Sequence, residues 1–425
     1  MTALPAGPGP VPAAVHRASV AVFLVFALNG FTFASWASRL PAVRDGLGFA
    51  PEQMGALLLV GAVGSLLSLP MSGMVVERLG ARRTVLFFAL VNAAGMVVAS
   101  VGVALGQVVV VGAGLMVFGV GTGVWDASMN LEGAVVEQRL GRTVMPRYHA
   151  GFSLGTVAAA GVAAVAAGAE VPVQVHIPVA VAAVSVGVAV AVRSFLPAGA
   201  EHDAAHAVPA DVRADVPAAP RGARGALAAW LEPRTLLVGV VVLAAALTEG
   251  AANDWLSLAV VDGFDTAHAV GAAAFGLFVT AMTTMRWFGT ALLDRRGRVA
   301  VLRLCGLLAL VGLLLFCLGG QLWLALVGVV VWGAGAAIGF PVGMSAASDD
   351  PLRAAARVSV VSTIGYAAFL AGPPLLGLLA QHVGYRHALL AIAVPVVGGL
   401  LVAGAAEPLR TPAARRVGGD AGGPV

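Results

Sequence analysis

GMVVERLGARR at positions 73–83 and TALLDRRGR at positions 290–298 each interrupt long apolar runs with a short charged string. In both strings an acidic residue is followed by arginine, one further residue and glycine, as ERLG at 77–80 and DRRG at 294–297. Glu77 and Asp294 are separated by 217 positions, about half of the 425-residue chain. A motif that recurs after half the length predicts a chain made of two similar halves.

The composition is typical of a membrane protein. Hydrophobic residues make up 59% of the chain and charged residues only 11%, which is more apolar surface than one soluble core can bury. The apolar runs are continuous rather than alternating, which excludes a transmembrane β-barrel and favours helices that satisfy their own backbone groups in lipid. A spanning helix needs about 20 apolar residues. We therefore expect an all-α membrane protein with twelve transmembrane helices in two six-helix bundles, at about residues 18–40, 52–75, 84–104, 107–135, 148–168, 175–196, 235–260, 270–292, 299–318, 322–346, 358–381 and 387–405.

The basic residues are all arginines, and they are unevenly distributed between the two sides of the predicted membrane. One side carries Arg78, Arg82, Arg83, Arg139, Arg142, Arg147, Arg295, Arg296, Arg298, Arg353 and Arg357, whereas the loops on the other side carry only Arg39, Arg44 and Arg386. Because arginine is enriched in cytoplasmic loops, we expect a multi-pass protein of the bacterial cytoplasmic (inner) membrane with both termini in the cytoplasm. The bias also explains the net charge of +4 without a nucleic-acid partner.

Composition divides the chain into five segments. Residues 1–17 are rich in Pro, Gly and Ala and have no apolar run before a cleavage site, so we expect a disordered cytoplasmic tail rather than a signal peptide. Hydropathy falls again at 197–232, which predicts a cytoplasmic linker between an N-terminal six-helix bundle, 18–196, and a C-terminal six-helix bundle, 233–406. We expect residues 407–425 to form a second cytoplasmic tail.

Histidines and cysteines indicate neither a metal site nor a disulfide. His202 and His206 have metal-ligand spacing but no further ligands. Cys305 and Cys317 fall on one predicted span, where they cannot easily bridge. We expect no metal and no cofactor.

The recurring strings predict a conformational gate at the cytoplasmic face. A glycine lets two helices approach closely, and the adjacent charges can form ion pairs in one conformation that break in another. The candidate gating residues are Gly73, Glu77, Arg78, Gly80 and Arg82 in the first string and Asp294, Arg295 and Gly297 in the second. The alternative is that the strings are basic loops that only orient the helices.

The first string resembles the signature of the major facilitator superfamily, G-x-x-x-(D/E)-R-x-G-x-(R/K)-(R/K), at every fixed position. The second copy is degenerate, with Thr290 in place of the first glycine. Over residues 18–405 the resemblance implies two six-helix bundles around a central cavity lined by the first, fourth, seventh and tenth helices. Three further strings, SWASRLPAVRDGLG at 35–48, DASMN at 126–130 with YHAGFSLG at 148–155, and EGAANDW at 249–255, are similar to the branch that contains rhizopine-transport-like and uncharacterised bacterial inner-membrane proteins, near the fucose-type proton symporters.

Polar residues inside the fourth predicted span mark one part of the candidate site. Ionisable side chains within spans are costly and usually face a cavity or a partner. Asp126 and Asn130 lie four residues apart on one helix face. Asp126 can carry a coupling proton or hold a substrate hydroxyl, with the Asn130 amide beside it. The alternative is that both residues fix helix packing.

The seventh predicted span carries the leading candidate for proton transfer, Glu249, close to mid-membrane. Burial of a carboxyl group brings its protonation into the physiological range. Asn253 and Asp254 follow on the same helix. The alternative for Glu249 is a structural ion pair with Arg286 of the eighth span.

Three further residues complete the predicted site. His149, at the start of the fifth span, can relay protons or simply bond to a neighbouring helix end. Asn29 and Trp36 share a face of the first span, and an amide beside an aromatic ring often meets a polyhydroxylated ligand. Core packing accounts for the aromatic residue equally well.

Together these features predict a secondary active transporter, working by alternating access, for a small polar solute that is sugar- or cyclitol-like. The chain contains no lysine and therefore no G-x-x-x-x-G-K-(S/T) nucleotide loop, so an ion gradient, most simply of protons, supplies the energy, or the protein is a uniporter. We expect a small-molecule substrate, protons and the lipid bilayer as partners, and a monomer. A proton-coupled efflux antiporter for amphipathic compounds is the alternative, although the fifth span lacks the Gly-Pro signature of drug exporters. An enzyme is not expected, because no nucleophile–base pair lies within the spans, and a non-transporting receptor is the remaining class.

Overall fold

The computed structural model describes residues 13–142, 144–197, 228–350 and 353–409. These residues are almost entirely helical and contain no strand, which confirms the all-α prediction. Most of the proposed tails and of the proposed linker lies outside the described residues. The helices of the N-terminal half are α1 (Ala13–Ala37), α2 (Leu40–Leu47), α3 (Pro51–Leu79), α4 (Ala81–Ala104), α5 (Val108–Leu140), α6 (Met145–Gly168) and α7 (Val173–Ala191).

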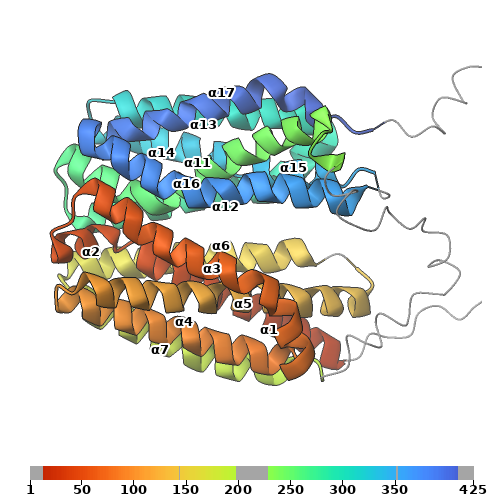
Figure 1. Cartoon of the computed structure of the whole chain (residues 1–425), viewed down its shortest axis with the longest axis horizontal. Coiled ribbons are helices and arrows are strands. Elements are labelled where there is room, and N and C mark those ends of the chain that lie inside the picture. Colours follow the sequence, from red (N-terminus) through yellow and green to blue (C-terminus); the bar gives the residue numbers. More distant parts are fainter. Residues whose placement is uncertain (1–12, 143, 198–227, 351–352, 410–425) are drawn as a thin grey trace, which may run out of the picture.

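The C-terminal half contains a second set of helices, together with short 3₁₀ turns. They are α11 (Pro233–Phe264), α12 (His268–Arg296), α13 (Arg298–Leu318), α14 (Leu322–Ala336), α15 (Gly339–Ala347), α16 (Ala354–Ala388) and α17 (Ala393–Val402). Figure 1 shows the two halves as separate bundles, with the N-terminal bundle below and the C-terminal bundle above.

The helices account for the twelve predicted spans. Eleven segments of the described chain are long and apolar enough to cross a membrane, and one of them, Ala356–Ala406, is 51 residues long. Gly384 interrupts this segment with φ 76° and ψ 157°, a conformation that only glycine adopts readily. The long segment is therefore two spans joined at Gly384, and the total agrees with the prediction.

The two charged strings build the same turn in each half. Gly80, between α3 and α4, has φ 75° and ψ 153°, and Gly297, between α12 and α13, has φ 77° and ψ 165°. These glycines are 217 positions apart, as Glu77 and Asp294 are. The repeat seen in the sequence is thus also a repeat of backbone conformation.

We expect Gly297→Ala to lower the free energy of unfolding by about 1–3 kcal/mol, because alanine must adopt a backbone conformation that residues with a Cβ avoid. Thermal unfolding of the detergent-solubilised protein measures the effect. Gly161→Ala is the matched control, because a Cβ at this helical glycine of α6 meets no atom within 4 Å. Equal unfolding temperatures for the two variants would show that the turn does not require glycine.

Glycines bring the helices of the N-terminal bundle into close contact. A Cβ at Gly155 of α6 would collide with the backbone of Ala27 in α1, and a Cβ at Gly95 of α4 would collide with the backbone of Phe118 in α5. Lipid provides little hydrophobic drive for helix association, so close backbone approach through small residues provides the packing energy. The Ala- and Gly-rich composition of these spans thus has a direct structural use.

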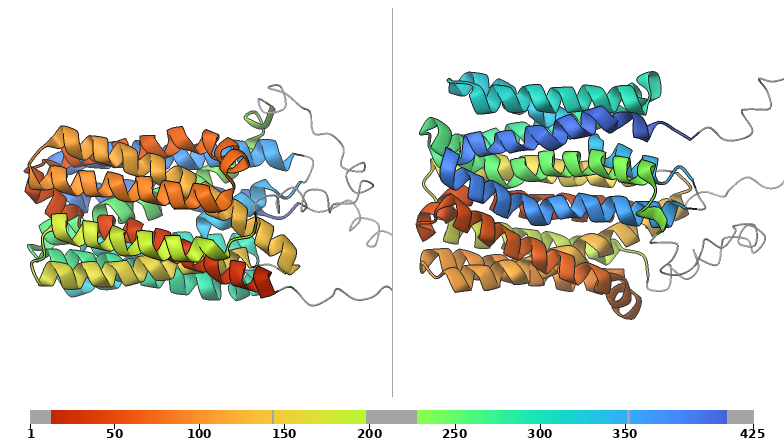
Figure 2. Two further views of the ribbon diagram at one scale, coloured as in Figure 1. Left: turned by 90° about the horizontal axis from the view of Figure 1, so that it is seen from below. Right: turned by 45° about the horizontal axis from the view of Figure 1, so that its top comes forward.

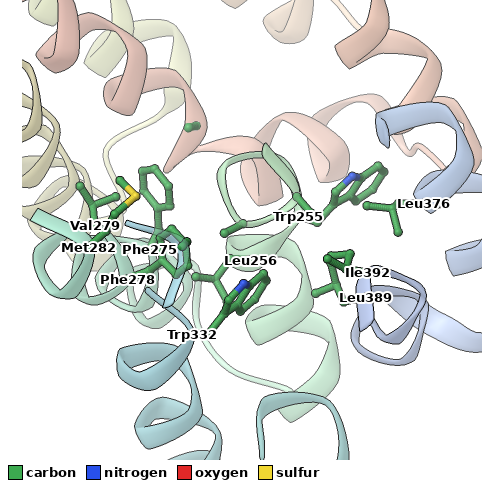
Figure 3. Packing of buried hydrophobic residues seen from close by; sticks show 14 of the residues in the cluster. Trp255, Leu256, Phe275, Phe278, Val279, Met282, Trp332, Leu376, Leu389 and Ile392 are labelled. Carbon is green, nitrogen blue, oxygen red and sulfur yellow. The ribbon is translucent and has the colours of Figure 1, made fainter. Parts of the chain in front are cut away.

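Aromatic side chains pack among aliphatic ones in the interior of the C-terminal bundle (Figure 3). Trp332 of α14 lies edge-on to Phe278 of α12, with ring centroids 5.3 Å apart, and its centroid is 6.0 Å from that of Phe316 in α13. Trp255 of α11 lies 5.5 Å from Tyr385, centroid to centroid. All five side chains are at most 4% exposed, so these rings tie the helices of the bundle together.

The two bundles contact each other mainly through two helix pairs, α3 with α16 and α6 with α12. The long helices run side by side along one axis, so that each bundle has two ends (Figure 2). The first described residues of α1 and the last described residues after α17 lie at one end, which we call the terminal end (Figure 1). The opposite end, which carries α2, is called the α2 end.

Close contacts between the bundles lie toward the α2 end. A Cβ at Gly377 of α16 would lie 2.7 Å from the carbonyl oxygen of Pro51, the first residue of α3. A Cβ at Gly276 of α12 would lie 3.2 Å from the Cβ of Ala160 in α6. The pairs that Arg44 forms with Asp262 and Asp45 forms with His268 join the two bundles and also lie at the α2 end. The bundles are therefore joined at one end and separate toward the other.

Candidate functional site

Glu249 and Arg286 form an ion pair at the middle of the C-terminal bundle. Glu249 is about 24 Å and about 22 Å from the two ends of α11, at 1.5 Å per residue. Its Oε2 accepts a hydrogen bond from Nη2 of Arg286 at 2.8 Å, and the Nε of Arg286 donates to the carbonyl oxygen of Ala337 at 2.9 Å. Ala337 lies in the break between α14 and α15, where a backbone carbonyl is free to accept. The side chains of Glu249 and Arg286 are 23% and 33% exposed, respectively, so the pair is partly accessible to solvent.

Asp126 is exposed at the middle of α5, although it lies about 27 Å and about 21 Å from the two ends of that helix. Tyr366 of α16, which is 44% exposed, lies within reach of the electrostatic field of Asp126. The two residues, which belong to opposite bundles, therefore lie near each other. Among the described residues, Asp126 has no ion-pair partner.

Asn130 turns its side-chain amide back onto its own helix. Its Nδ2 donates to the backbone carbonyl oxygen of Asp126 at 2.8 Å. The amide is thus near Asp126, as the four-residue spacing predicted, but its donor contacts the backbone rather than the carboxylate. The amide oxygen remains able to accept a hydrogen bond from a ligand.

His149 is exposed one turn inside the start of α6. Its ring lies edge-on to Phe26 of α1, with centroids 5.1 Å apart. The charge of Arg286, in the other bundle, acts on this imidazole. His149 of the N-terminal bundle thus lies within electrostatic range of Arg286, which pairs with Glu249 in the C-terminal bundle.

The other predicted residues lie away from these side chains. Asn29 and Trp36 are 4% and 5% exposed, and the Nδ2 of Asn29 contacts the sulfur of Met129 at 3.5 Å, which favours the packing alternative for both. Asn253 and Asp254 are half-buried on α11. Asp254 is about 15 Å from the α2 end of that helix, nearer to the closed end than Glu249 is.

The predicted gating residues lie in an open region at the terminal end. Glu77, Arg78, Arg82, Asp294 and Arg295 are all exposed. A Cβ at Gly73 would meet no atom within 4 Å, so no helix packs against this glycine in the present conformation. A gate formed by these strings would have to assemble in the other conformation, when the terminal end closes.

A network of ion pairs within the C-terminal bundle covers the same end of the molecule. Asp349 bridges Arg234 at 2.9 Å and Arg298 at 2.6 Å. Glu232, just before α11, accepts hydrogen bonds from Arg357 at 2.6 Å and Arg353 at 2.9 Å. The arginines of this network thus join the ends of α11, α13 and α16.

We expect Glu232→Gln to lower thermal stability near neutral pH and to have no effect in acid. The hydrogen bond from Arg357, more than any other contact, holds the pKa of Glu232 below its ordinary value of 4.5. Because the folded-state pKa is the lower one, the stabilisation is present above pH 4.5 and is lost as the pH falls through the folded pKa.

Unfolding temperatures of parent and variant, measured from neutral pH downward, test this expectation. The exposed Glu170 provides the control variant Glu170→Gln. A difference between parent and Glu232→Gln that persists undiminished at the acid limit would contradict the ion-pair assignment.

Sequence analysis missed Tyr366 and Asp349. Tyr366 is one of three tyrosines in the chain, and its position in a span was the available signal. Asp349 sits beside Asp350 in a loop that was considered only for its arginines. Neither residue could be paired with its partner from spacing along the chain.

Comparison with known proteins agrees with this architecture. Residues 22–356 match the family profile of the Major Facilitator Superfamily. The uncharacterised transporter y4wD of Sinorhizobium fredii is 32% identical over 382 residues, which cover 88% of this chain and 96% of the relative. The membrane protein MosC of Rhizobium meliloti is 26% identical over 384 residues, covering 90% and 88% of the two chains. The solved structure of a D-xylose–proton symporter matches with a TM-score of 0.68 at 12% identity, covering 92% of this chain and 97% of that one.

Two helical bundles that are joined at one end and direct charged side chains at each other define a multi-pass membrane transporter rather than an enzyme. The protein belongs to the Major Facilitator Superfamily, as the family match and the y4wD relative both show. The resemblance recognised in the first charged string is therefore confirmed.

Proposed function

We propose that this protein is a proton-coupled secondary transporter of a small polar solute, sugar- or cyclitol-like, which binds between the bundles 18–196 and 233–406. The observation that carries the proposal is the exposed Asp126 at mid-span, which has no ion-pair partner among the described residues and lies near Tyr366 of the other bundle. An unpartnered ionised carboxylate is costly at membrane depth. It gains by taking up a proton or by binding a ligand hydroxyl, and these are the two events that a symporter must link.

The ion pair of Glu249 with Arg286 favours a positioning role for Glu249. The carboxylate of Glu249 is compensated by the guanidinium of Arg286 at 2.8 Å, whereas Asp126 has no ion-pair partner among the described residues. We assign the coupling proton to Asp126, and to Glu249 the task of holding Arg286 near His149. Tyr366, Arg286 and His149 then offer hydroxyl, guanidinium and imidazole groups to a polyhydroxylated solute.

The similar fold of a D-xylose–proton symporter supports both the solute class and the coupling ion. The arginine distribution supports a cytoplasmic location of the terminal end in the bacterial inner membrane. In that orientation the protein is open to the cytoplasm and closed on the far side. We further propose that it acts as a monomer, since each chain has both bundles and the site between them.

Proton and solute flux in proteoliposomes tests the proposal. Purified protein is supplied with pooled sugars, cyclitols, amino acids and cationic drugs, and internal pH is followed with a fluorescent indicator. We expect a sugar or cyclitol pool to drive protons in the same direction as the solute. Opposite movement of protons and a cationic drug would instead identify an efflux antiporter, solute movement without protons a uniporter, and binding without movement a receptor.

A further inference from the structure

The α2 end is closed by charged side chains that belong to a short helix between the first two spans. Arg44 of α2 forms an ion pair with Asp262 at the end of α11, and the neighbouring Asp45 pairs with His268, the first residue of α12, at 2.8 Å. Both pairs join the N-terminal bundle to the C-terminal bundle. Arg44 also lies over the ring of Tyr385, 5.7 Å from its centroid.

Arg44 is much less exposed than the two carboxylates that contact it. Arg44 is only 13% exposed, whereas Asp45 and Asp262 are 46% and 41% exposed. The guanidinium therefore inserts between the bundles, and the two carboxylates cover it from the solvent side. When such an ion pair breaks, its charged groups become hydrated and no hydrophobic core is exposed. An interface between bundles that must open and close requires contacts of this kind.

Water can reach the second pair from one side. A cavity of about 490 Å³ beside α2 is lined by Arg39, Glu170 and His268, among others. The charged residues that share this cavity with His268 are Arg39 and Glu170, whereas Asp45 contacts the imidazole directly. The imidazole and its carboxylate partner can be rehydrated when the bundles separate, which lowers the free-energy difference between the closed and open states.

We propose that Arg44 and Asp45 on α2, with Asp262 and His268, form a gate that holds the α2 end shut, so that breaking these pairs shifts the protein toward a conformation open at that end. The gate rests on the alternating-access mechanism proposed above but not on the identity of the solute or the ion. The proposed gate closes the α2 end, just as the charged strings are predicted to close the terminal end in the other conformation. Loss of either pair should destabilise only the closed state.

The distance across the α2 end is the quantity to measure. Cysteines introduced at Leu105, in the turn after α4, and at Gly320, in the turn after α13, carry spin labels after Cys305 and Cys317 are replaced by alanine. Electron–electron double resonance in nanodiscs then gives the populations of short and long distances. We expect Asp262→Asn and Asp45→Asn each to raise the ratio of long to short distances by about two- to fivefold, the range typical of single exposed ion pairs.

Two further variants make the test specific. Asp265→Asn removes a carboxylate from the same loop that has no described ion pair and that adopts φ 49°, which asparagine tolerates, so its distances should match those of the parent. Exchange of the charges, Arg44→Asp with Asp262→Arg, should restore the short distance.

Unchanged distance populations in both single variants, or an exchange variant that stays open, would overturn the gate. These outcomes are independent of transport. Proton-coupled uptake with unchanged distances refutes the gate alone, whereas shifted distances without any proton-coupled uptake refute the proposed function alone.

Discussion

Asp126→Asn is expected to reduce proton-driven solute uptake by about 100-fold, in the range that a positioned proton-transfer group contributes. Asparagine has nearly the same shape and can still hydrogen-bond to a solute hydroxyl, but it cannot take up or release a proton. Exchange of labelled for unlabelled solute across the membrane should therefore persist, because exchange requires no net proton movement. The measurement is uptake under an imposed pH gradient, compared with exchange in its absence.

The control for Asp126 is a carboxylate outside the site. Asp265 is exposed in the loop between α11 and α12, and Asp265→Asn should leave uptake and exchange at the parental level. If Asp126→Asn retains uptake that still follows the pH gradient, the proton is carried elsewhere, and Asp254 becomes the next residue to replace. If both uptake and exchange disappear, Asp126 is needed for binding rather than for coupling.

Arg286→Gln is expected to have the second large effect, because it leaves Glu249 without its partner. Removing one partner of a fully buried pair costs about 3–5 kcal/mol. Because Glu249 and Arg286 are 23% and 33% exposed, water compensates part of this cost, and we expect a loss of about 1–2 kcal/mol of unfolding free energy. Solute uptake should fall as well, since the guanidinium between Glu249 and His149 is lost.

The double variant Glu249→Gln with Arg286→Gln separates charge pairing from contact with the solute. Stability should return to within about 1 kcal/mol of the parent, because no unpaired charge remains. Uptake should stay low, because the site lacks its cation. If the double variant instead loses as much stability as Glu249→Gln and Arg286→Gln lose together, the ion pair contributes nothing measurable to stability.

The sequence predicted the scaffold better than the site. The turn at Gly297 was predictable because its glycine, arginine and acidic residue are adjacent in the chain. The pairing of Glu249 with Arg286 was named as an alternative, because two charges in neighbouring spans seek compensation. The proximity of Tyr366 to Asp126 was not predicted, because the two residues lie in different bundles.

Arg44 shows most clearly where prediction from sequence ends. In the sequence it counts only as one of the few arginines on the side that is predicted to be non-cytoplasmic. In the structure it contacts Asp262, 218 positions further along the chain, and closes one end of the molecule. Asn29 and Trp36 show the converse, since their shared helix face suggested a ligand site and their burial places them in packed interior.

The sequence by itself determined that the protein is a membrane protein of twelve spans with a repeated turn, because lipid requires each span to satisfy its own backbone and to carry enough apolar residues locally. Such constraints act within about 20 neighbouring residues, so they can be recognised from the sequence alone. Tertiary structure alone decided which carboxylates are paired, which face the gap, and which end of the molecule is closed. Those properties depend on contacts between helices that are distant in the chain, and on a balance between two conformations that the same residues support.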